Sequence, residues 1–454
     1  MKSWRFLLAF AAIAFVAARP VDLYRLVDDL FSSDAAERAA ARDALIARND
    51  LTIAPALVDA HFFNTAGRAE TIQVLEHLLR EKHGTSFKGW VEAIGRREDI
   101  VPAKGYLAFK ARLFAKIDPA LAAFLCGGQA ILPVPDGRQN CLPSTTIRAE
   151  EIVWGGVKKD GIPALDNPAF VDAASATWML DEEQVFGVSI GGDVRAYPNR
   201  ILAWHEMAND RAGGRAVSLS YCTLCGAAIL YDGRASDGRT YTFGSSGFLY
   251  RSNKLMYDRQ TNTLWSQLTG EPVMGPVARK GIRLRVLPLT VTTWGEWRRM
   301  HPKTRVLSLE TGFKRDYRPG AAYGDYFASP HLMFPVWKKA DAGLESKEWV
   351  LVVNVDSARK IYPIDDLPSL LHDRAGERDL VIVDERVYYT EGRRFTRDGA
   401  SLVDDASGER FAIEEEALAS AAGTRLPRVA SHRAFWFGAY AFYPGTEVWR
   451  PPTR

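Results

Sequence analysis

The sequence predicts an α+β protein in which a helical segment precedes a duplicated, mainly β domain. Apolar residues in the first part, residues 20–125, recur at steps of three and four, a spacing typical of amphipathic helices. From residue 152 onward, short runs of Val, Ile, Tyr and Phe are separated by clusters of Gly, Pro, Asp and Asn. Such a texture is typical of strands joined by tight turns. One long motif of this second part occurs twice.

The composition is that of a globular protein and excludes several classes. The chain has 454 residues, of which 47% are hydrophobic and 25% charged, so it is not a mostly disordered chain. Lys and Arg total 58 against 55 Asp and Glu, a formal net charge of +3. This near balance gives no electrostatic footprint for nucleic acid, and we expect no nucleic-acid partner. Four cysteines are too few for a disulfide-packed scaffold.

Residues 1–19 have the features of a secretory signal peptide. Lys2 and Arg5 form a positive start, the stretch from Phe6 to Ala18 is apolar, and small residues follow Val16. The apolar stretch is shorter than the about 20 residues that a transmembrane helix needs. We therefore expect a periplasmic or secreted protein with no transmembrane helix in the mature chain. The alternative is an uncleaved membrane anchor.

The helical segment, residues 20–125, resembles a degenerate HEAT-type repeat. Ser33-Asp34 is a typical N-cap before a strong helix-forming run that ends at Asn49-Asp50, and residues 53–58 begin another helix. Repeat units of this kind bury their apolar faces only by stacking on one another. We interpret the segment as a structural cap on the rest of the protein. The functional alternative is a surface that docks a protein partner.

A linker is predicted at residues 126–151, which are rich in Pro and Gly. It carries Cys126 and Cys141. In an exported protein, two cysteines that close a short loop are most simply a structural disulfide. A second metal or redox pair is the alternative.

An internal repeat divides the β-rich part into two halves, residues 152–310 and 311–454. The segment VFGVSIGGDVRAYPNRIL begins at Val185, and VLVVNVDSARKIYPIDDL begins at Val350. They align without a gap and keep the same alternation of apolar positions, as a conserved strand register requires. Each copy predicts a strand, a tight turn, a second strand and a Tyr-Pro turn into a short helix.

The first half alone contains a candidate site. His205-Glu206 and a Cys-x-x-Cys pair, Cys222 and Cys225, follow its repeat motif. At the same offset the second half has Leu370, Val387 and Thr390 in place of His205, Cys222 and Cys225. The fold therefore does not need these side chains, which is the pattern expected of chemistry added to a scaffold.

The leading hypothesis for this site is a transition-metal centre holding Cu or Zn. Two sulfurs and an imidazole fit these metals and do not fit Mg or Ca. The predicted ligands are Cys222, Cys225 and His205. Further ligands, or residues that orient the ligands, are expected among Glu206, Met256 and Asp258, and a Met256 thioether would favour copper.

Two other hypotheses remain open, and no catalytic residue is assigned. In the second, the protein is a thiol–disulfide oxidoreductase in which Cys222 attacks and Cys225 resolves; His205, if charged, would lower the pKa of Cys222. In the third, it is a non-catalytic binding module with a structural Cys pair. Positions 205–209 read HEMAN, which is not the HExxH of a zinc peptidase. A small-residue run at 243–253 predicts a pocket lined by Ser246, Arg251 and Asn253.

Several long segments resemble the DUF3179 family (domain of unknown function 3179). They are DGIPALDNP at 160–168, AYPNRILAWHEMAND, SYCTLCGAAI, FGSSGFLYRSNKLMYDRQTNTLWSQLTGEPVMGP and FWFGAYAFYPGT at 435–446. The resemblance covers most of residues 150–450, and the leading helical segment is similar to what often precedes this domain. It implies functional positions at His205, Glu206, Cys222 and Cys225, but no reaction, because the family's function is not assigned. Thr223 stands where the family pattern usually has Pro, which alters the stiffness of the loop.

Overall fold

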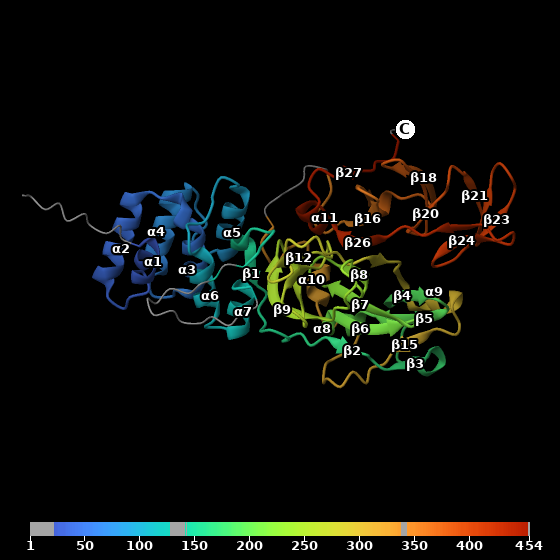
Figure 1. Cartoon of the computed structure of the whole chain (residues 1–454), viewed down its shortest axis with the longest axis horizontal. Coiled ribbons are helices and arrows are strands. Elements are labelled where there is room, and N and C mark those ends of the chain that lie inside the picture. The colour runs from blue at the N-terminus through green and yellow to red at the C-terminus, as the bar shows by residue number, and fades with distance from the viewer. Residues whose placement is uncertain (1–21, 128–140, 142, 337–342, 453–454) are drawn as a thin grey trace, which may run out of the picture. The chain divides into compact units, whose positions relative to one another are not determined.

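The computed structural model describes residues 22–127, 141, 143–336 and 343–452 (Figure 1). The predicted signal peptide, residues 1–19, lies outside them. The chain divides into two compact units, Met1–Thr85 and Ser86–Arg454. Within the described residues, no helix combines the length and apolar character needed to cross a membrane.

The first unit is helical, as the sequence predicts. Its elements are α1 (Leu23–Asp29), α2 (Ala35–Arg48), η1 (Leu51–Ile53), α3 (Ala54–Phe63) and α4 (Arg68–Leu79). The Asp34 carboxylate accepts a hydrogen bond from the Ala36 N–H and so caps α2, and Asn49 ends that helix in the left-handed conformation at a φ of 48°. Nearly all of α3 is buried, since α1 and α4 both pack against it.

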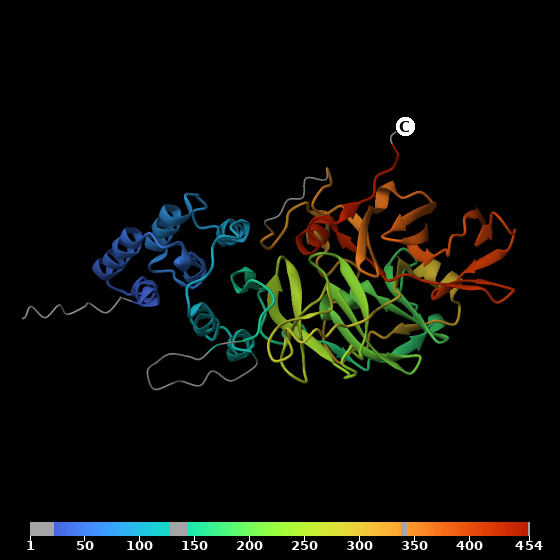
Figure 2. The same ribbon diagram turned by 45° about the horizontal axis from the view of Figure 1, so that its top comes forward.

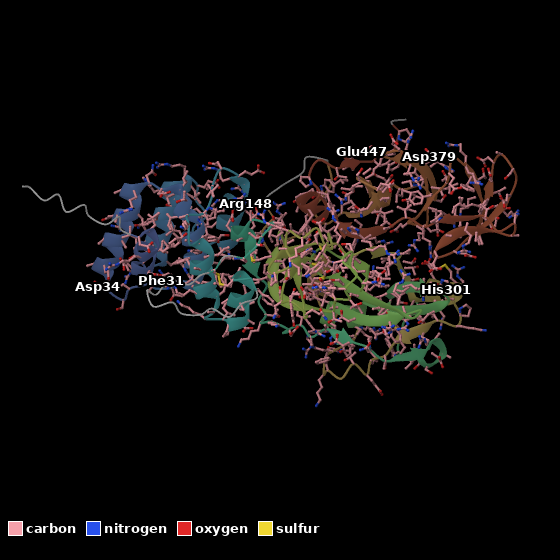
Figure 3. The ribbon with its side chains drawn as sticks, in the orientation of Figure 1. Phe31, Asp34, Arg148, His301, Asp379 and Glu447 are labelled. Carbon is pink, nitrogen blue, oxygen red and sulfur yellow. A yellow bond between two sulfur atoms is a disulfide. The ribbon has the colours of Figure 1, made fainter. Side chains whose placement is uncertain are left out.

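Three further helices belong to the second unit, so the break between units lies after Thr85 rather than in the predicted linker at 126–151. They are α5 (Phe87–Arg96), α6 (Tyr106–Phe114) and α7 (Pro119–Leu125). Ring contacts of Phe114 with Phe248 and of Phe124 with Tyr257 attach α6 and α7 to the neighbouring strands β9 (Phe243–Tyr250) and β10 (Asn253–Asp258). The Arg148 guanidinium (Figure 3) donates to the carbonyl groups of the α5 end. Cys126 and Cys141, the expected pair, form a disulfide.

The first β half contains three five-stranded sheets. One has the order β1 (Ile152–Trp154), β9 (Phe243–Tyr250), β10 (Asn253–Asp258), β11 (Leu264–Ser266), β12 (Pro272–Met274). The next is β13 (Val286–Leu287), β8 (Ala227–Asp232), β7 (Arg215–Cys222), β6 (Met207–Ala212), β2 (Leu165–Asp166). The third is β14 (Thr290–Thr293), β4 (Gln184–Ile190), β5 (Asp193–Pro198), β15 (Arg305–Leu307), β3 (Phe170–Asp172). Short helices η2 (Ala149–Glu151), η3 (Ala173–Ser175), α8 (Asn199–His205) and α9 (Trp294–Met300) accompany them.

The second half is also built of sheets, as Figure 2 shows from a second direction. The first has the order β26 (Ser431–Phe435), β16 (Trp349–Val355), β17 (Ala358–Pro363), β27 (Glu447–Val448). The second is β18 (Leu370–Ala375), β19 (Arg378–Val383), β20 (Arg386–Tyr389). The third runs β21 (Phe395–Asp398), β22 (Ser401–Asp404), β23 (Arg410–Ile413), β24 (Ala417–Ser420), β25 (Arg425–Pro427). Its helices are α10 (Gly324–Ala328), η4 (Ile364–Asp366) and α11 (Trp436–Phe442).

The core of the first half joins the β4–β5 sheet to the β6–β8 sheet. Phe186 of β4 and Leu219 of β7 are among its fully buried members. A buried polar link crosses the same layer: the Tyr197 hydroxyl donates to the Asp210 carboxylate at 2.6 Å, and Arg195 pairs with that carboxylate. The charge of Asp210 is thus compensated inside the protein, as burial requires. These contacts fix α8 and the start of β6, and hence one wall of the candidate site.

We predict that Gly187→Ala destabilises the protein. A Cβ at Gly187 in β4 would lie 2.3 Å from the Trp297 ring, and that ring is fully buried and held by a hydrogen bond to Thr304. Overpacking of this kind costs about 1–3 kcal/mol of unfolding free energy, measurable by chemical denaturation. Gly324→Ala is the control, because nothing lies within 4 Å of its added Cβ. Equal stability of the two variants would contradict the prediction.

Candidate functional site

The two cysteines of the Cys-x-x-Cys motif lie on the hairpin turn between β7 and β8. Cys222 is the last residue of β7 and pairs with Ala227 of β8, so the turn brings Cys225 back beside it. Both thiols are free, and the residues are 1% and 0% exposed. Gly226 follows at a φ of 64°, where an added Cβ would meet the Trp349 ring at 2.4 Å. Only glycine fits there, for conformational and steric reasons.

The pKa values of the two thiols are shifted in opposite directions. Burial alone would raise the pKa of the Cys222 thiol, but hydrogen bonds from the Cys225 thiol and from the backbone N–H groups of Cys225 and Lys254 hold that pKa below its ordinary value. Burial, and then the hydrogen bond to Cys222, raise the pKa of Cys225 well above its usual range. The pair is therefore asymmetric: one sulfur favours the thiolate and the other retains its proton.

Asn253 is the predicted pocket residue that touches the pair. The tight turn at Arg251 and Ser252 places it at the start of β10, where its amide donates to Cys225 Sγ at 3.1 Å and to Gln267 Oε1 at 2.7 Å. The Gln267 amide in turn donates to the carbonyl groups of Ser220 and Ala227. This chain holds the Asn253 donor against the sulfur.

The other two predicted pocket residues serve the scaffold. The Ser246 hydroxyl donates to the Leu255 carbonyl of the neighbouring strand. Arg251 pairs with Glu151 at 2.8 Å and donates to the Ala441 carbonyl. Both side chains therefore tie strand β9 and its turn to adjacent segments.

A buried acid–base pair lies next to the thiols. Glu206 ends α8 at a φ of 54°, accepts a hydrogen bond from the Thr223 hydroxyl at 3.2 Å, and lies 3.8 Å from Lys254 Nζ. Lys254 Nζ also donates to the Glu206 carbonyl. Burial raises the pKa of Glu206 and lowers the pKa of Lys254, and each charge partly opposes the shift of the other. The pair can thus take up or release a proton inside the protein.

His205 makes its contacts elsewhere. Its Nδ1 lies 2.8 Å from the Pro163 carbonyl, which can only accept, so Nδ1 carries the proton and Nε2 accepts from the Tyr317 hydroxyl. Burial lowers the pKa of this histidine, which keeps the ring neutral. His205 therefore carries no positive charge that could lower the pKa of Cys222. Hydrogen bonds to the Cys222 sulfur lower that pKa instead.

His205 contacts Pro163 and Tyr317 in this structure rather than the two cysteines. Within the described ranges, no group of three or more His, Cys, Asp or Glu side chains is placed to hold a metal ion. The Asp258 carboxylate accepts hydrogen bonds from the backbone N–H of Thr261 and from the Trp265 indole, and so organises the turn after β10. Met256 is fully buried in β10. Cys222 and Cys225 are the two expected ligands that lie together.

Residues of the second half cover the β7–β8 turn that carries Cys222 and Cys225. The Tyr326 hydroxyl donates to the Leu224 carbonyl at 2.6 Å, and the Phe435 N–H donates to the Cys225 carbonyl at 2.8 Å. Gly438 of α11 lies so close that its Cβ would be 3.0 Å from the Cys225 Cβ. These residues escaped the sequence reasoning because contacts between distant segments leave no local pattern. Lys254 did leave a signal in the sequence, because it is a lysine directly before the apolar residues Leu255 and Met256 of β10.

The fold and the site together define a helical and β-rich protein with a buried, asymmetric dithiol. A family model described as a protein of unknown function, DUF3179, matches residues 159–446, which is more than half of the chain. The chain therefore belongs to the DUF3179 family. No curated protein and no solved structure matches it.

We predict that Cys225→Ala raises the pKa of Cys222. The substitution removes the thiol that donates to the Cys222 sulfur, while burial, which disfavours the thiolate, remains. The ultraviolet absorbance of the thiolate should then appear at higher pH than in the unmodified protein. Cys225→Ser is the matched control, because its hydroxyl still donates. An unchanged titration in Cys225→Ala would show that this hydrogen bond does not set the pKa.

Proposed function

We propose that this protein is a thiol–disulfide oxidoreductase whose active pair is Cys222 and Cys225. The observation that carries the proposal is geometric: two free thiols lie on one hairpin turn, Cys225 Sγ accepts a hydrogen bond from the Asn253 amide at 3.1 Å, and the buried pair Glu206 and Lys254 lies beside them. A thiolate is the attacking species in thiol–disulfide exchange, whereas the resolving thiol keeps its proton until the second step. Both cysteines are free, as the reduced form requires. Both are also buried, so the attack on a substrate disulfide requires the residues that cover the turn to move aside.

The proposed reaction balances without a cofactor. The Cys222 thiolate attacks one sulfur of a substrate disulfide, forming a mixed disulfide and releasing the other substrate sulfur as a thiolate. Cys225 then loses its proton and attacks the Cys222 sulfur, which releases the second substrate thiolate. The protein pair is oxidised to a disulfide and the substrate disulfide is reduced to two thiols. The reverse sequence transfers the disulfide to a substrate.

Glu206 and Lys254 are the proposed acceptors of the Cys225 proton. Whether they begin as an ion pair or as two neutral groups, uptake of one proton gives the same product, a protonated carboxyl beside an ammonium. Both side chains are buried, at 6% and 4% exposure, so bulk water does not compete for this transfer. The charges of Cys222 and Cys225 raise the pKa of Lys254 against the effect of its burial, which is the coupling that such a transfer needs.

Copper binding is the second candidate function. Two free thiols that converge on one hairpin turn are a ready pair of soft ligands, and thiolates select Cu(I) and Zn. Zinc in structural sites takes four ligands, whereas His205 is engaged with Pro163 and Tyr317. Of the two metals, the pair of thiolates therefore fits Cu(I) better.

Export and internal duplication are also proposed. The Cys126–Cys141 disulfide supports export, because structural disulfides persist mainly in oxidising compartments. The orders β14-β4-β5-β15 and β26-β16-β17-β27 support duplication, since each contains an antiparallel hairpin with a parallel strand added beside it. Within this scheme the HEAT-like helical segment is a cap or a docking face for a protein partner.

We predict that glutathione redox buffers interconvert the pair between dithiol and disulfide. After acid quenching and alkylation, mass spectrometry should show a two-thiol change at Cys222 and Cys225. Cys225→Ser should stop at a mixed disulfide on Cys222, whereas Cys222→Ser should form none, because the attacking thiolate is lost.

Metal analysis, together with the redox assay, gives the result that would contradict the oxidoreductase proposal. If the protein purifies with near-stoichiometric copper, the copper is lost in Cys222→Ser, and the thiols do not oxidise in these buffers, then the oxidoreductase is contradicted and the metal function is supported.

We predict that Lys254→Met and Glu206→Gln slow the closure of the disulfide. With oxidised glutathione as the probe, both variants should accumulate the Cys222 mixed disulfide, because removal of a positioned base slows proton transfer by on the order of 100-fold. Lys158→Met, at an exposed lysine, is the control. Closure at the same rate in all three variants would exclude the acid–base pair from the reaction.

A further inference from the structure

A second cluster of buried charges lies on a pocket between β14 of the first half and β20 and β26 of the second. Arg386, Arg428 and His432 line this pocket, whose volume is about 20 Å³. The side chains of Arg386 and Arg428 are 7% and 3% exposed, and His432 is 5% exposed. Buried side chains of this kind need partners that offset their charge or accept their hydrogen bonds.

The cluster contains more positive than negative charge. Glu415 is the carboxylate that faces both guanidinium groups, at 2.9 Å from Arg386 and 2.7 Å from Arg428. Burial would raise the pKa of Glu415, but His301 (Figure 3) and the two arginines hold that pKa well below its usual range, so the group is ionised. The other acids lining the pocket are matched one to one: Glu385 pairs with Arg433, and Asp384 pairs with Arg397. One positive charge is left over.

Three nitrogens of residues that line the pocket have no hydrogen-bond partner among the residues that the structure describes. Arg428 Nε is buried without a hydrogen bond, although both of its terminal nitrogens are bonded to Thr290, Glu415 and the Leu289 carbonyl. Both ring nitrogens of His432 are likewise buried and unbonded. Burial, and then the charge of Arg359, lowers the pKa of His432 to about 3, so its ring is neutral and offers one N–H donor. Buried donors are rarely left unsatisfied in folded proteins.

We propose that this pocket binds a small oxyanion, a single carboxylate or phosphate group, that is held by Arg428 and His432. The anion balances the extra positive charge and accepts hydrogen bonds from the donors that have no partner. With a volume of about 20 Å³, the pocket admits only the oxyanion group itself, on its own or as the acidic end of a larger molecule. The pocket is separate from the Cys222–Cys225 turn, and the proposal does not depend on the redox function.

The test is thermal unfolding of the full chain with added sodium phosphate or sodium acetate, against sodium chloride at equal ionic strength. We expect the melting temperature to rise with one of the two oxyanions, because a ligand of the native state stabilises it by mass action. A rise with acetate identifies a carboxylate site, and a rise with phosphate identifies a phosphate site. No rise with either would overturn the proposal and leave water as the partner of the free nitrogens.

The variant His432→Leu separates binding from folding. Because the His432 ring makes no hydrogen bond to any residue that the structure describes, Leu should preserve stability in chloride while weakening oxyanion binding about tenfold or more. Arg410→Gln, at an exposed arginine that pairs with Asp398, should keep the full response. An undiminished response in His432→Leu would also overturn the proposal. Titration calorimetry of the unmodified protein with phosphate and acetate gives the same decision should the variant not fold.

Discussion

Burial of the β7–β8 turn is the constraint on which the rest of the candidate site depends. Two thiols, a carboxyl and an amine lie where water does not reach, so each must find its partner within the protein. The partners come from four segments: the end of α8, the turn itself, the start of β10 and the strand β11 region that carries Gln267. Because the polar groups of these segments are one another's hydrogen-bond partners, the geometry of the site depends on all four segments together.

The same constraint explains the asymmetry of the cysteines. In water the two thiols would have nearly the same pKa, since they are chemically identical. In the turn both sulfurs accept hydrogen bonds: Cys222 from backbone N–H groups and from the Cys225 thiol, and Cys225 from the Asn253 amide and the Ala227 N–H. The hydrogen bond from the Cys225 thiol to the Cys222 sulfur is the contact that favours the thiolate at Cys222 and the protonated thiol at Cys225. The amine beside the pair is Lys254, whereas His205 is neutral and bonded to Tyr317.

Sequence reasoning succeeded where local pattern determines structure. The helical first part, the β-rich second part and the family follow from periodicity and motif, and Cys222 ends a strand because an apolar run leads into a Gly-containing turn. It could not place His205, whose ring is oriented by Pro163 and Tyr317, residues far from it along the chain. It also missed the grouping of α5–α7 with the β-rich unit, which depends on aromatic contacts such as Phe114 with Phe248.

The contact of Gly226 with Trp349 has a further consequence. The turn that carries the cysteines belongs to the first half, yet its outer wall is made by Trp349, Phe435 and Gly438 of the second. The second half, which has no Cys-x-x-Cys motif of its own, thus covers the turn that carries the motif of the first half. The two halves therefore enclose the cysteine turn together, and the first half alone would leave the Gly226 and Cys225 side of that turn uncovered.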